Sequence, residues 1–293
     1  MSFEIFTDTS ANLTREITEE LNIRVIPFSY FIDGKEHICE DLSHFDGEAY
    51  YNAMKHGVMP KTSQINPARY IEYMEAALAD GHDVLYIGMS SGVSGSFASS
   101  KIASAHLSEK YPERKIIRID TLGASLGEGI PVICAARWRN EGRGIDDVAE
   151  KTGSLVHRMY QVFTVGDLMH LRRNGRLSGI GALLGSALSI KPLLKGDENG
   201  KIVNFATARG RRRAIRAMYE KYDALAVRPG HQTVGIAHAG CPEDAELLAE
   251  MLREHTSPPA EIITVCYEPV TGAHVGPGTL ALFFEGGEGV RNK

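Results

Sequence analysis

The sequence predicts an α/β protein with an N-terminal parallel-sheet α/β domain over residues 1–157 and a C-terminal α+β domain over residues 158–293. Strand-like and helical stretches alternate through the first half, which is typical of a parallel sheet covered by helices. After Tyr160, the turn-forming cluster GDENG at 196–200 separates two strand-like runs and indicates a hairpin. A chain of 293 residues also suits two hydrophobic cores better than one.

Local patterns place the elements of the first domain. Asn66 and Pro67 form a strong helix start, because Asn caps a helix and Pro suits the first helical position. Asp146 likewise caps a helix that runs to about His157. Further helices are expected at 41–56, from about 94 onward, and at 131–140. Strands are expected at 3–6, 23–32, 84–88 and 115–120, and a loop with three glycines at 121–129.

The second domain has a different order of elements. Strands are expected at 161–165, twice within 192–208, and at 232–239, 262–268 and 280–285. Helices are expected at 167–175, 179–187, 209–225 and 243–255, the last of them opened by Pro242. The segment PVTGAHVGPGT, which precedes the final strand, is expected to be a loop. Strands paired by a hairpin beside helices predict an α+β domain.

Composition narrows the class of protein. The chain is 43% hydrophobic, yet no apolar run approaches the roughly 20 residues of a membrane span. Its first residues, MSFEIFTDTS, lack the features of a secretory signal, so we expect a soluble cytoplasmic protein without stable membrane insertion. The four cysteines, at 39, 134, 241 and 266, are far apart and predict buried thiols. With no metal-ligand spacing and no phosphate-loop motif, no metal or cofactor is expected.

Positive charge is concentrated in one segment. The net charge is −5, but residues 167–216 contain 11 Lys and Arg against 3 Asp and Glu. Nucleic acid is one explanation for such a block. The segment has no series of aromatic residues for stacking bases, so no nucleic acid partner is expected. An acidic protein partner or a phosphorylated ligand fits this charge as well.

The stretch VLYIGMSSGVSGSFASS at 84–100 indicates a strand, a turn rich in Ser and Gly, and a helix that begins near Ser94. The first N–H groups of such a helix have no intrahelical partner and attract anions, carboxylate or phosphate alike. Thr62 and Ser63 lie in a predicted loop that leads into another helix. Their hydroxyls are therefore either available to bind a ligand or part of the turn chemistry, and the two interpretations are equal at this point.

A serine hydrolase is the alternative function. Gly88 to Gly92 match G-x-S-x-G after a strand, which would make Ser90 a nucleophile, with Asp120 and either His238 or His274 as its partners. The pattern arises easily in a segment so rich in Ser and Gly, and the helix begins too late for an elbow. His274, in a Gly- and Pro-rich loop, is balanced between a structural and a functional role. A helix cap is favoured over direct chemistry for Asp8.

The sequence resembles the DegV family of fatty-acid-binding proteins almost from end to end. Seven motifs occur in order: TDTSANLT at 7–14, KTSQINP at 61–67, SSGVSGSFASS at 90–100, DTLGASLGEG at 120–129, LRRNGRLSG at 171–179, LSIKPLL at 188–194 and AHVGPGTLALFF at 273–284. Some positions depart from the usual pattern. Ser96, Phe97 and Ala98 stand where Thr, Tyr and Gln are common, and Arg173-Asn174 where Gly-Gly is frequent.

This resemblance implies a carrier rather than an enzyme. A long-chain fatty acid would lie in an apolar tunnel buried between and within the two domains, with Thr62 and Ser94 holding its carboxylate. The other residues implied near the headgroup are Ser63, Gly95, Ser96 and His274. In bacteria with a fatty acid kinase, similar proteins present the fatty acid to that kinase, and the acyl-phosphate feeds phospholipid synthesis.

The resemblance also offers a role for the basic segment. The residues concerned are Arg172, Arg173, Arg176, Lys191 and Arg209. They could dock an acidic surface of the kinase or stabilise the phosphate that arrives at the carboxylate. The alternative is a solvated basic face without a partner.

Overall fold

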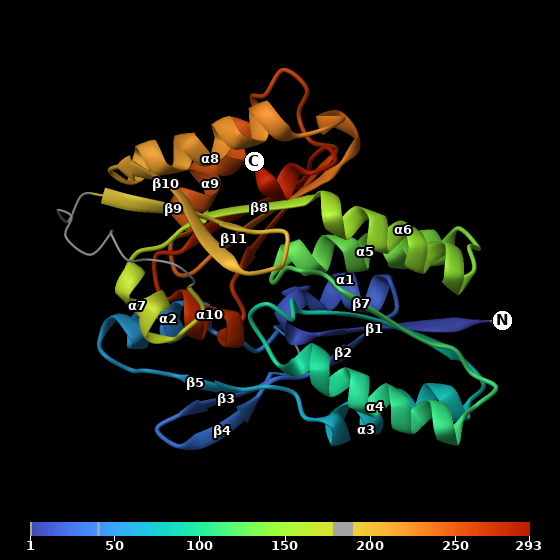
Figure 1. The fold of residues 1–293 in the computed structure, drawn as a ribbon. Helices are drawn as coiled ribbons and strands as arrows, with labels where there is room; N and C mark the ends of the chain where they lie inside the picture. The colour runs from blue at the N-terminus through green and yellow to red at the C-terminus, as the bar shows by residue number, and fades with distance from the viewer. Residues whose placement is uncertain (1, 40–41, 178–189) are drawn as a thin grey trace. The chain divides into compact units, whose positions relative to one another are not determined.

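The computed structural model describes residues 2–39, 42–177 and 190–293. The chain divides into two compact units, one formed by residues 1–45 and 60–156 and the other by residues 46–59 and 157–293. One unit contains a parallel sheet and the other a mixed sheet (Figure 1), which confirms the predicted α/β class.

Helix α2 (Gly47–Lys55), which the predicted boundary assigns to the first domain, belongs to the second unit. Its tyrosines explain why. The Tyr50 hydroxyl donates to the Pro269 carbonyl at 2.7 Å, and the Tyr51 hydroxyl donates to the Tyr267 carbonyl at 2.8 Å. These are tertiary contacts across more than 200 residues of sequence, which local patterns do not reveal.

A four-stranded parallel sheet forms the centre of the first unit, in the order β2-β1-β6-β7. Its strands are β1 (Phe3–Asp8), β2 (Ile23–Ile26), β6 (Asp83–Gly88) and β7 (Ile116–Asp120). Helices α3 (Pro67–Ala79) and α4 (Ser96–Lys110) cover one face, and α1 (Arg15–Glu20) and α5 (Leu126–Asn140) cover the other (Figure 1). Because the strands are parallel, their last residues, Asp8, Gly88 and Asp120, lie at the same edge of the sheet.

A second, three-stranded antiparallel sheet belongs to the same unit, in the order β4-β3-β5. It contains β3 (Ser29–Ile32), β4 (Lys35–Ile38) and β5 (Lys61–Ser63). The predicted single strand over 23–32 is therefore wrong, since the chain leaves the parallel sheet at Pro27, which has no N–H to donate. The predicted loop at Thr62 and Ser63 is also wrong, because both residues pair with β3.

Helix α5 begins at Leu126, within the segment 121–129 that the sequence predicts as a loop. The glycines of this segment allow close packing. A Cβ at position 129 would lie 2.4 Å from the carbonyl oxygen of Ala11, in the short 3-10 helix η1 (Thr9–Ala11). Gly129 thus lets the first turn of α5 approach the loop that follows β1. Helix α6 (Ile145–Arg158) follows, close to its predicted range.

The second unit contains a six-stranded sheet in the order β10-β9-β8-β13-β11-β12. Its strands are β8 (Met159–Thr164), β9 (Ile190–Gly196), β10 (Ile202–Arg209), β11 (Thr233–His238), β12 (Glu261–Cys266) and β13 (Leu280–Glu285). β9 and β10 form the predicted hairpin. Among the named strand pairs, β11 with β12 is parallel and the others are antiparallel.

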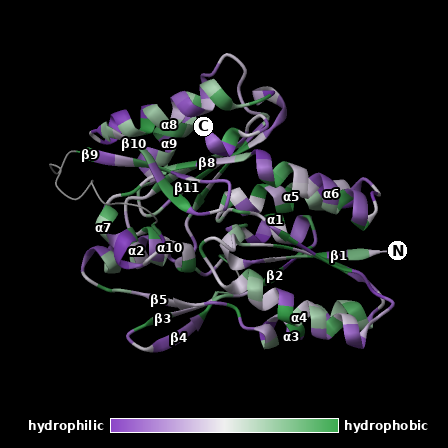
Figure 2. Ribbon diagram, viewed as in Figure 1, coloured by the Kyte–Doolittle hydropathy of each residue, from purple (hydrophilic) through white to green (hydrophobic). Residues whose placement is uncertain are grey.

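Helices α8 (Arg211–Leu225) and α9 (Pro242–Arg253) pack against this sheet. Apolar and polar turns alternate along α8 in Figure 2, and its buried residues Ala214, Ile215, Met218 and Tyr222 recur at helical spacing. The remaining helices are α7 (Leu168–Arg173), α10 (Pro269–Val275), η2 (Pro229–His231) and η3 (Val290–Asn292). The helix predicted at 179–187 lies outside the described residues.

Part of the predicted loop over 269–279 is helical, because α10 occupies its first seven residues. Glu268 caps this helix, and its carboxylate oxygens accept from the N–H groups of Val270 and Thr271 at 2.5 Å each. In the described ranges, no helix is both long enough and apolar enough to cross a membrane.

Candidate functional site

The N-terminus of α4 is the first part of the candidate site. The helix begins at Ser96, with Gly95 as its N-cap residue, close to the start predicted near Ser94. Ser94 still contributes to capping, because its Oγ accepts from the Ser96 N–H at 3.2 Å. The same hydroxyl donates to Ser96 Oγ at 3.0 Å. Ser94 is half-buried, which leaves it accessible to a small group.

The segment after β5 is joined to this helix terminus. Gln64 Nε2 donates to Ser99 Oγ at 3.3 Å, and the Ile65 N–H donates to Ser96 Oγ at 3.1 Å. A Cβ at Gly95 would lie 2.1 Å from Gln64 Oε1, so the glycine permits this close approach. The structure therefore brings two motifs together that are about 30 residues apart in the sequence.

The predicted headgroup residues of the first unit differ in their exposure. Thr62 is half-buried on β5, whereas Ser63 and Gly95 are exposed. Ser96 is buried, and its hydroxyl holds Ile65 and Ser94 in place. Thr62 and Ser94 thus have the partial burial that suits ligand contact, and Ser96 has the surroundings of a residue that shapes the turn.

A buried acidic cluster lies behind this helix terminus, at the end of β1. Asp8 and Glu128 are both 0% exposed. Ser10 Oγ lies 2.6 Å from Asp8 Oδ1 and 2.5 Å from Glu128 Oε2, and Thr7 Oγ1 donates to Glu128 Oε1 at 3.0 Å. Asp8 also accepts from the Ser10 N–H at 3.0 Å, which is the capping role favoured from the sequence.

Burial controls the ionisation of both acids. It raises the pKa of Glu128 well above its ordinary value, and the nearby Asp8 adds to that effect. Burial also raises the pKa of Asp8, while hydrogen bonds from Ser10, Tyr86 and Met89 oppose the change. Glu128 is not among the residues predicted from the sequence motifs. The sequence feature that could have indicated a buried role for Glu128 is a single charged residue among the apolar and small residues of the segment LGEGIPV.

The hydrolase alternative is not favoured by the surroundings of Ser90. This residue is 1% exposed, and its Oγ accepts from the Gly92 N–H at 3.0 Å. It lies six residues before the first residue of α4, outside the first helical turn where a nucleophile elbow places its serine. Asp120, the proposed acid, accepts from the N–H groups of Ser91 and Leu122 at 3.2 and 2.9 Å and so supports the turn. His238 and His274 belong to the other unit.

His274 lies on α10 in the second unit and is half-buried. Burial, with Arg176 and His170 nearby, lowers its pKa to about 4. The imidazole is therefore neutral at pH 7, so it can donate one hydrogen bond and accept another. His170 Nε2 contacts the Ala273 carbonyl at 2.7 Å and fixes the same short helix.

The five predicted partner-facing residues all belong to the second unit. Arg172, Arg173 and Arg209 are exposed. Arg173 forms a surface ion pair with Asp167 at 3.4 Å. The two others are half-buried and donate to backbone carbonyls, Arg176 to Asn174 at 2.6 Å and Lys191 to Gly166 at 3.2 Å.

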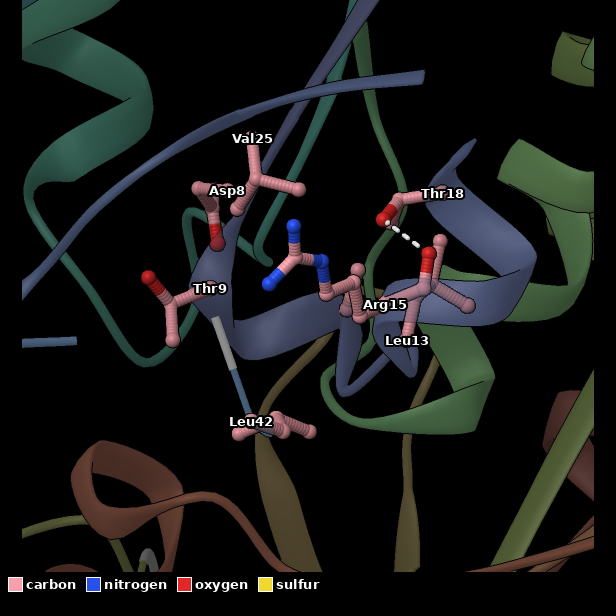
Figure 3. Close-up of a pocket in the computed structure, with 8 residues that line it drawn as sticks. Asp8, Thr9, Leu13, Arg15, Thr18, Val25 and Leu42 are labelled. Carbon is pink, nitrogen blue, oxygen red and sulfur yellow. Dashed lines mark hydrogen bonds between the residues drawn. The ribbon is translucent and has the colours of Figure 1, made fainter. Parts of the chain in front are cut away.

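A pocket opens beside Asp8 in the first unit, with about 320 Å³ of space including the part open to solvent. It is lined by Asp8, Thr9, Ala11, Leu13, Arg15, Thr18, Val25 and Leu42. Figure 3 shows the guanidinium of Arg15 extending toward Asp8 and Val25. The lining contains none of the predicted headgroup residues. Nor do the described residues contain a group of His, Cys, Asp and Glu able to hold a metal ion.

Comparison with known proteins identifies the relatives of this chain. The family model described as "Uncharacterised protein, DegV family" matches residues 2–286. The chain belongs to the DegV family. A DegV domain-containing protein of Clostridium perfringens is 40% identical over 284 residues, covering 97% of each chain. One of Streptococcus pyogenes is 35% identical over 286 residues, covering 98% of this chain and 99% of that one.

Solved structures of DegV proteins have the same fold. A DegV family protein from Thermus thermophilus, described by its fatty acid binding, has a TM-score of 0.88 at 25% identity, covering 98% of this chain and all of that one. A fatty acid binding DegV family protein from Streptococcus agalactiae has a TM-score of 0.83 at 28% identity, with 98% and 99% coverage. DegV of Bacillus subtilis, described as a fatty acid binding protein, has a TM-score of 0.81 at 27% identity, with 98% and 100% coverage.

Proposed function

We propose that this DegV chain binds a long-chain fatty acid in a buried apolar tunnel and presents it to a fatty acid kinase. The hydroxyls of Thr62 and Ser94 hold the headgroup, and the kinase converts the carboxyl group to an acyl-phosphate for phospholipid synthesis in the cytoplasm. The observation that carries the proposal is the junction of β5 with α4. There the Ile65 N–H donates to Ser96 Oγ and Gln64 Nε2 donates to Ser99 Oγ. These bonds support a headgroup site that combines the KTSQINP motif with the motif at the start of α4.

The chemistry of this junction suits a carboxyl headgroup. Hydroxyls and helix N–H groups satisfy a carboxyl group without a buried counter-ion. Affinity then comes mainly from the tail. Each methylene removed from water contributes about 0.8 kcal/mol, so a sixteen-carbon chain supplies roughly 10 kcal/mol before ordering costs. A headgroup site of neutral donors therefore needs only to orient the ligand, and it leaves the carboxyl group open to a second protein.

The relatives support the ligand class. The Thermus thermophilus, Streptococcus agalactiae and Bacillus subtilis proteins are each described as fatty acid binding, and each aligns with at least 98% of this chain. A carrier role also agrees with the state of Ser90, which is buried and lies outside the first turn of α4.

Mass spectrometry of lipid extracted from natively purified protein tests the ligand. We expect a long-chain fatty acid in near-stoichiometric amount. Parallel treatment with a fluorophosphonate probe should leave Ser90 unmodified, since its hydroxyl is buried. Covalent labelling of Ser90 with no recovered fatty acid would favour the esterase.

Charge reversal at Arg173 and Arg209 tests presentation to a kinase. Both side chains are exposed, so the double variant Arg173→Glu, Arg209→Glu should fold and bind lipid normally. If these residues dock an acidic kinase surface, we expect kinase-dependent acyl-phosphate formation to fall about tenfold, mainly through slower association. The measurement is the phosphorylation rate at several salt concentrations.

Arg253→Glu is the matched control, because Arg253 is an exposed arginine of the same unit that pairs with Glu246 on α9. It should retain the wild-type rate. An unchanged rate in the Arg173, Arg209 double variant would identify the basic residues as a solvated face and remove them from the proposal.

A further inference from the structure

Thr62 lies in a row of side chains that crosses the three-stranded sheet of the first unit. Strand β3 lies between β4 and β5 in this sheet (Figure 1). Tyr30 on β3 is paired with His37 on β4 and with Thr62 on β5. Residues directly opposite each other in antiparallel strands project from the same face of the sheet, with Cβ atoms about 4.5–5.5 Å apart. The three side chains therefore stand next to one another on one face, with Tyr30 in the middle.

This row is more covered than the rest of the two outer strands. Thr62 is the half-buried residue of β5, and its two neighbours in that strand are exposed. His37 is likewise the half-buried residue of β4, and the three other residues of that strand are exposed. Each outer strand is thus half-buried at the residue that lies opposite Tyr30. Side chains of this kind are shielded from bulk water but can still contact a bound molecule.

The stacking of Tyr30 on His37 sets the direction in which the tyrosine ring faces. The two ring centroids are 5.1 Å apart, and the ring planes are 19° from parallel. His37 therefore covers the face of the ring that is directed toward β4. Because β5 lies on the other side of β3, the second face of the ring is directed toward Thr62.

A group bound to the Thr62 hydroxyl would lie beside this second face. The side chain of tyrosine is longer than that of threonine, so its ring extends past the Thr62 hydroxyl to the level of a bound group. In a fatty acid, the carboxyl group continues into methylene groups, which gain free energy from contact with an apolar ring face. Burial raises the pKa of Tyr30, so the ring carries a neutral hydroxyl and no negative charge that would repel a carboxylate.

The segment that follows Thr62 connects this row to the start of α4. The Ile65 N–H donates to Ser96 Oγ at 3.1 Å, and Gln64 Nε2 donates to Ser99 Oγ at 3.3 Å. All of these residues belong to the first unit. The aromatic row and the helix terminus that carries the proposed function are thus two sides of one packed arrangement around β5.

We propose that Tyr30 is a further ligand-contacting residue, and that the face of its ring turned away from His37 packs against the first methylene groups of a fatty acid bound at Thr62. His37 is the positioning residue that holds the ring in this orientation. The inference rests on the proposed function, because it requires a carboxyl group at Thr62. Tyr30 and His37 lie outside the seven sequence motifs, so this contact is not part of the motif pattern.

Palmitate labelled with ¹³C at C2 tests the contact in the wild-type protein. Protons that lie above the face of an aromatic ring resonate upfield, so the C2 protons of bound palmitate should show an upfield NMR shift. A nuclear Overhauser effect should also connect them with the ring protons of Tyr30. This second measurement needs no variant, and it keeps the test decisive if a substitution impairs folding.

Substitutions of Tyr30 and His37 separate the ring contact from other effects. Tyr30→Ala should abolish the upfield shift and weaken palmitate binding about tenfold, as expected when about two methylene groups are left exposed to water. Tyr30→Phe retains the ring and should retain both the shift and the affinity. His37→Ala should reduce the shift and weaken binding about threefold, because the ring must then be ordered on binding. His37→Phe supplies a new stacking partner and should restore the shift.

Phe31→Ala is the matched control, because Phe31 is the next residue of β3 and is also half-buried, but projects from the opposite face of the sheet. It should keep the wild-type shift and affinity. An equal loss of affinity in Phe31→Ala, or the same C2 proton shift in wild type and Tyr30→Ala, would overturn the inference while leaving the proposed function intact. Wild-type protein that binds no palmitate would overturn the proposed function itself.

Discussion

Replacement of Thr62 and Ser94 together by alanine should weaken fatty acid binding about thirtyfold or more. Each substitution removes one hydrogen-bond partner of a headgroup that is withdrawn from water, and each such loss costs about 1–3 kcal/mol. Two losses amount to at least about 2 kcal/mol, and 1.4 kcal/mol corresponds to a factor of ten. Displacement of a fluorescent fatty acid measures the change, and the lipid recovered with the purified variant should fall in parallel.

Ser91→Ala is the control for this experiment. Ser91 is an exposed serine of the same turn, and its backbone N–H rather than its hydroxyl binds Asp120. This variant should bind fatty acid with wild-type affinity. Thermal unfolding of all variants separates a loss of ligand contact from a loss of fold. A Thr62, Ser94 double variant that keeps full lipid occupancy would place the headgroup elsewhere.

The fold class was accessible from the sequence because it depends on local patterns. Apolar strands and capped helices each have a pattern that can be seen in a short stretch of sequence. Helix α3, for example, begins at Pro67, as its Asn-Pro start predicts. The errors have a different origin. Helix α2 belongs to the second unit because of the hydrogen bond from Tyr51 to the Tyr267 carbonyl, which no local pattern encodes. Gly129 indicates a loop by composition, yet it serves close packing against Ala11.

The candidate site shows the same difference between features that local patterns predict and features that depend on tertiary contacts. The hydroxyl motifs were predicted as a headgroup site from the family resemblance, because the residues alone left an anion site, a nucleophile elbow and turn chemistry open. The hydrogen bond that joins them, from the Ile65 N–H to Ser96, could not be predicted, since it depends on how the segment after β5 packs against α4. The pairing of Asp8 with Glu128 through Ser10 was also inaccessible, because 120 residues separate the two acids. An isolated carboxyl in a sequence does not show that another carboxyl lies beside it.

Substitution of Glu128 by glutamine should stabilise the protein increasingly as the pH rises above about 5. Burial raises the pKa of Glu128 in the folded chain, whereas the unfolded chain has an ordinary pKa of about 4.3. Between the two values the folded state binds more protons, so the free energy of unfolding falls with rising pH, by up to about 1.4 kcal/mol per unit. The decrease ends once the pH exceeds the folded pKa. Glutamine cannot ionise and removes this decrease, as urea unfolding between pH 4.5 and 9 can measure.

Glu75→Gln supplies a control of opposite sign. The hydrogen bond from Lys110 lowers the pKa of Glu75, so its carboxylate stabilises the folded state above the unfolded pKa and loses that effect in acid. This variant should lose stability relative to wild type as the pH rises. Asp8, whose pKa is also raised, is coupled to Glu128 through Ser10, so the difference between wild type and Glu128→Gln measures the two acids together. If Glu128→Gln and wild type instead keep a constant difference from pH 4.5 to 9, Glu128 has the same protonation in both states. Glu128 would then be ionised in the folded chain throughout this range, contrary to its raised pKa.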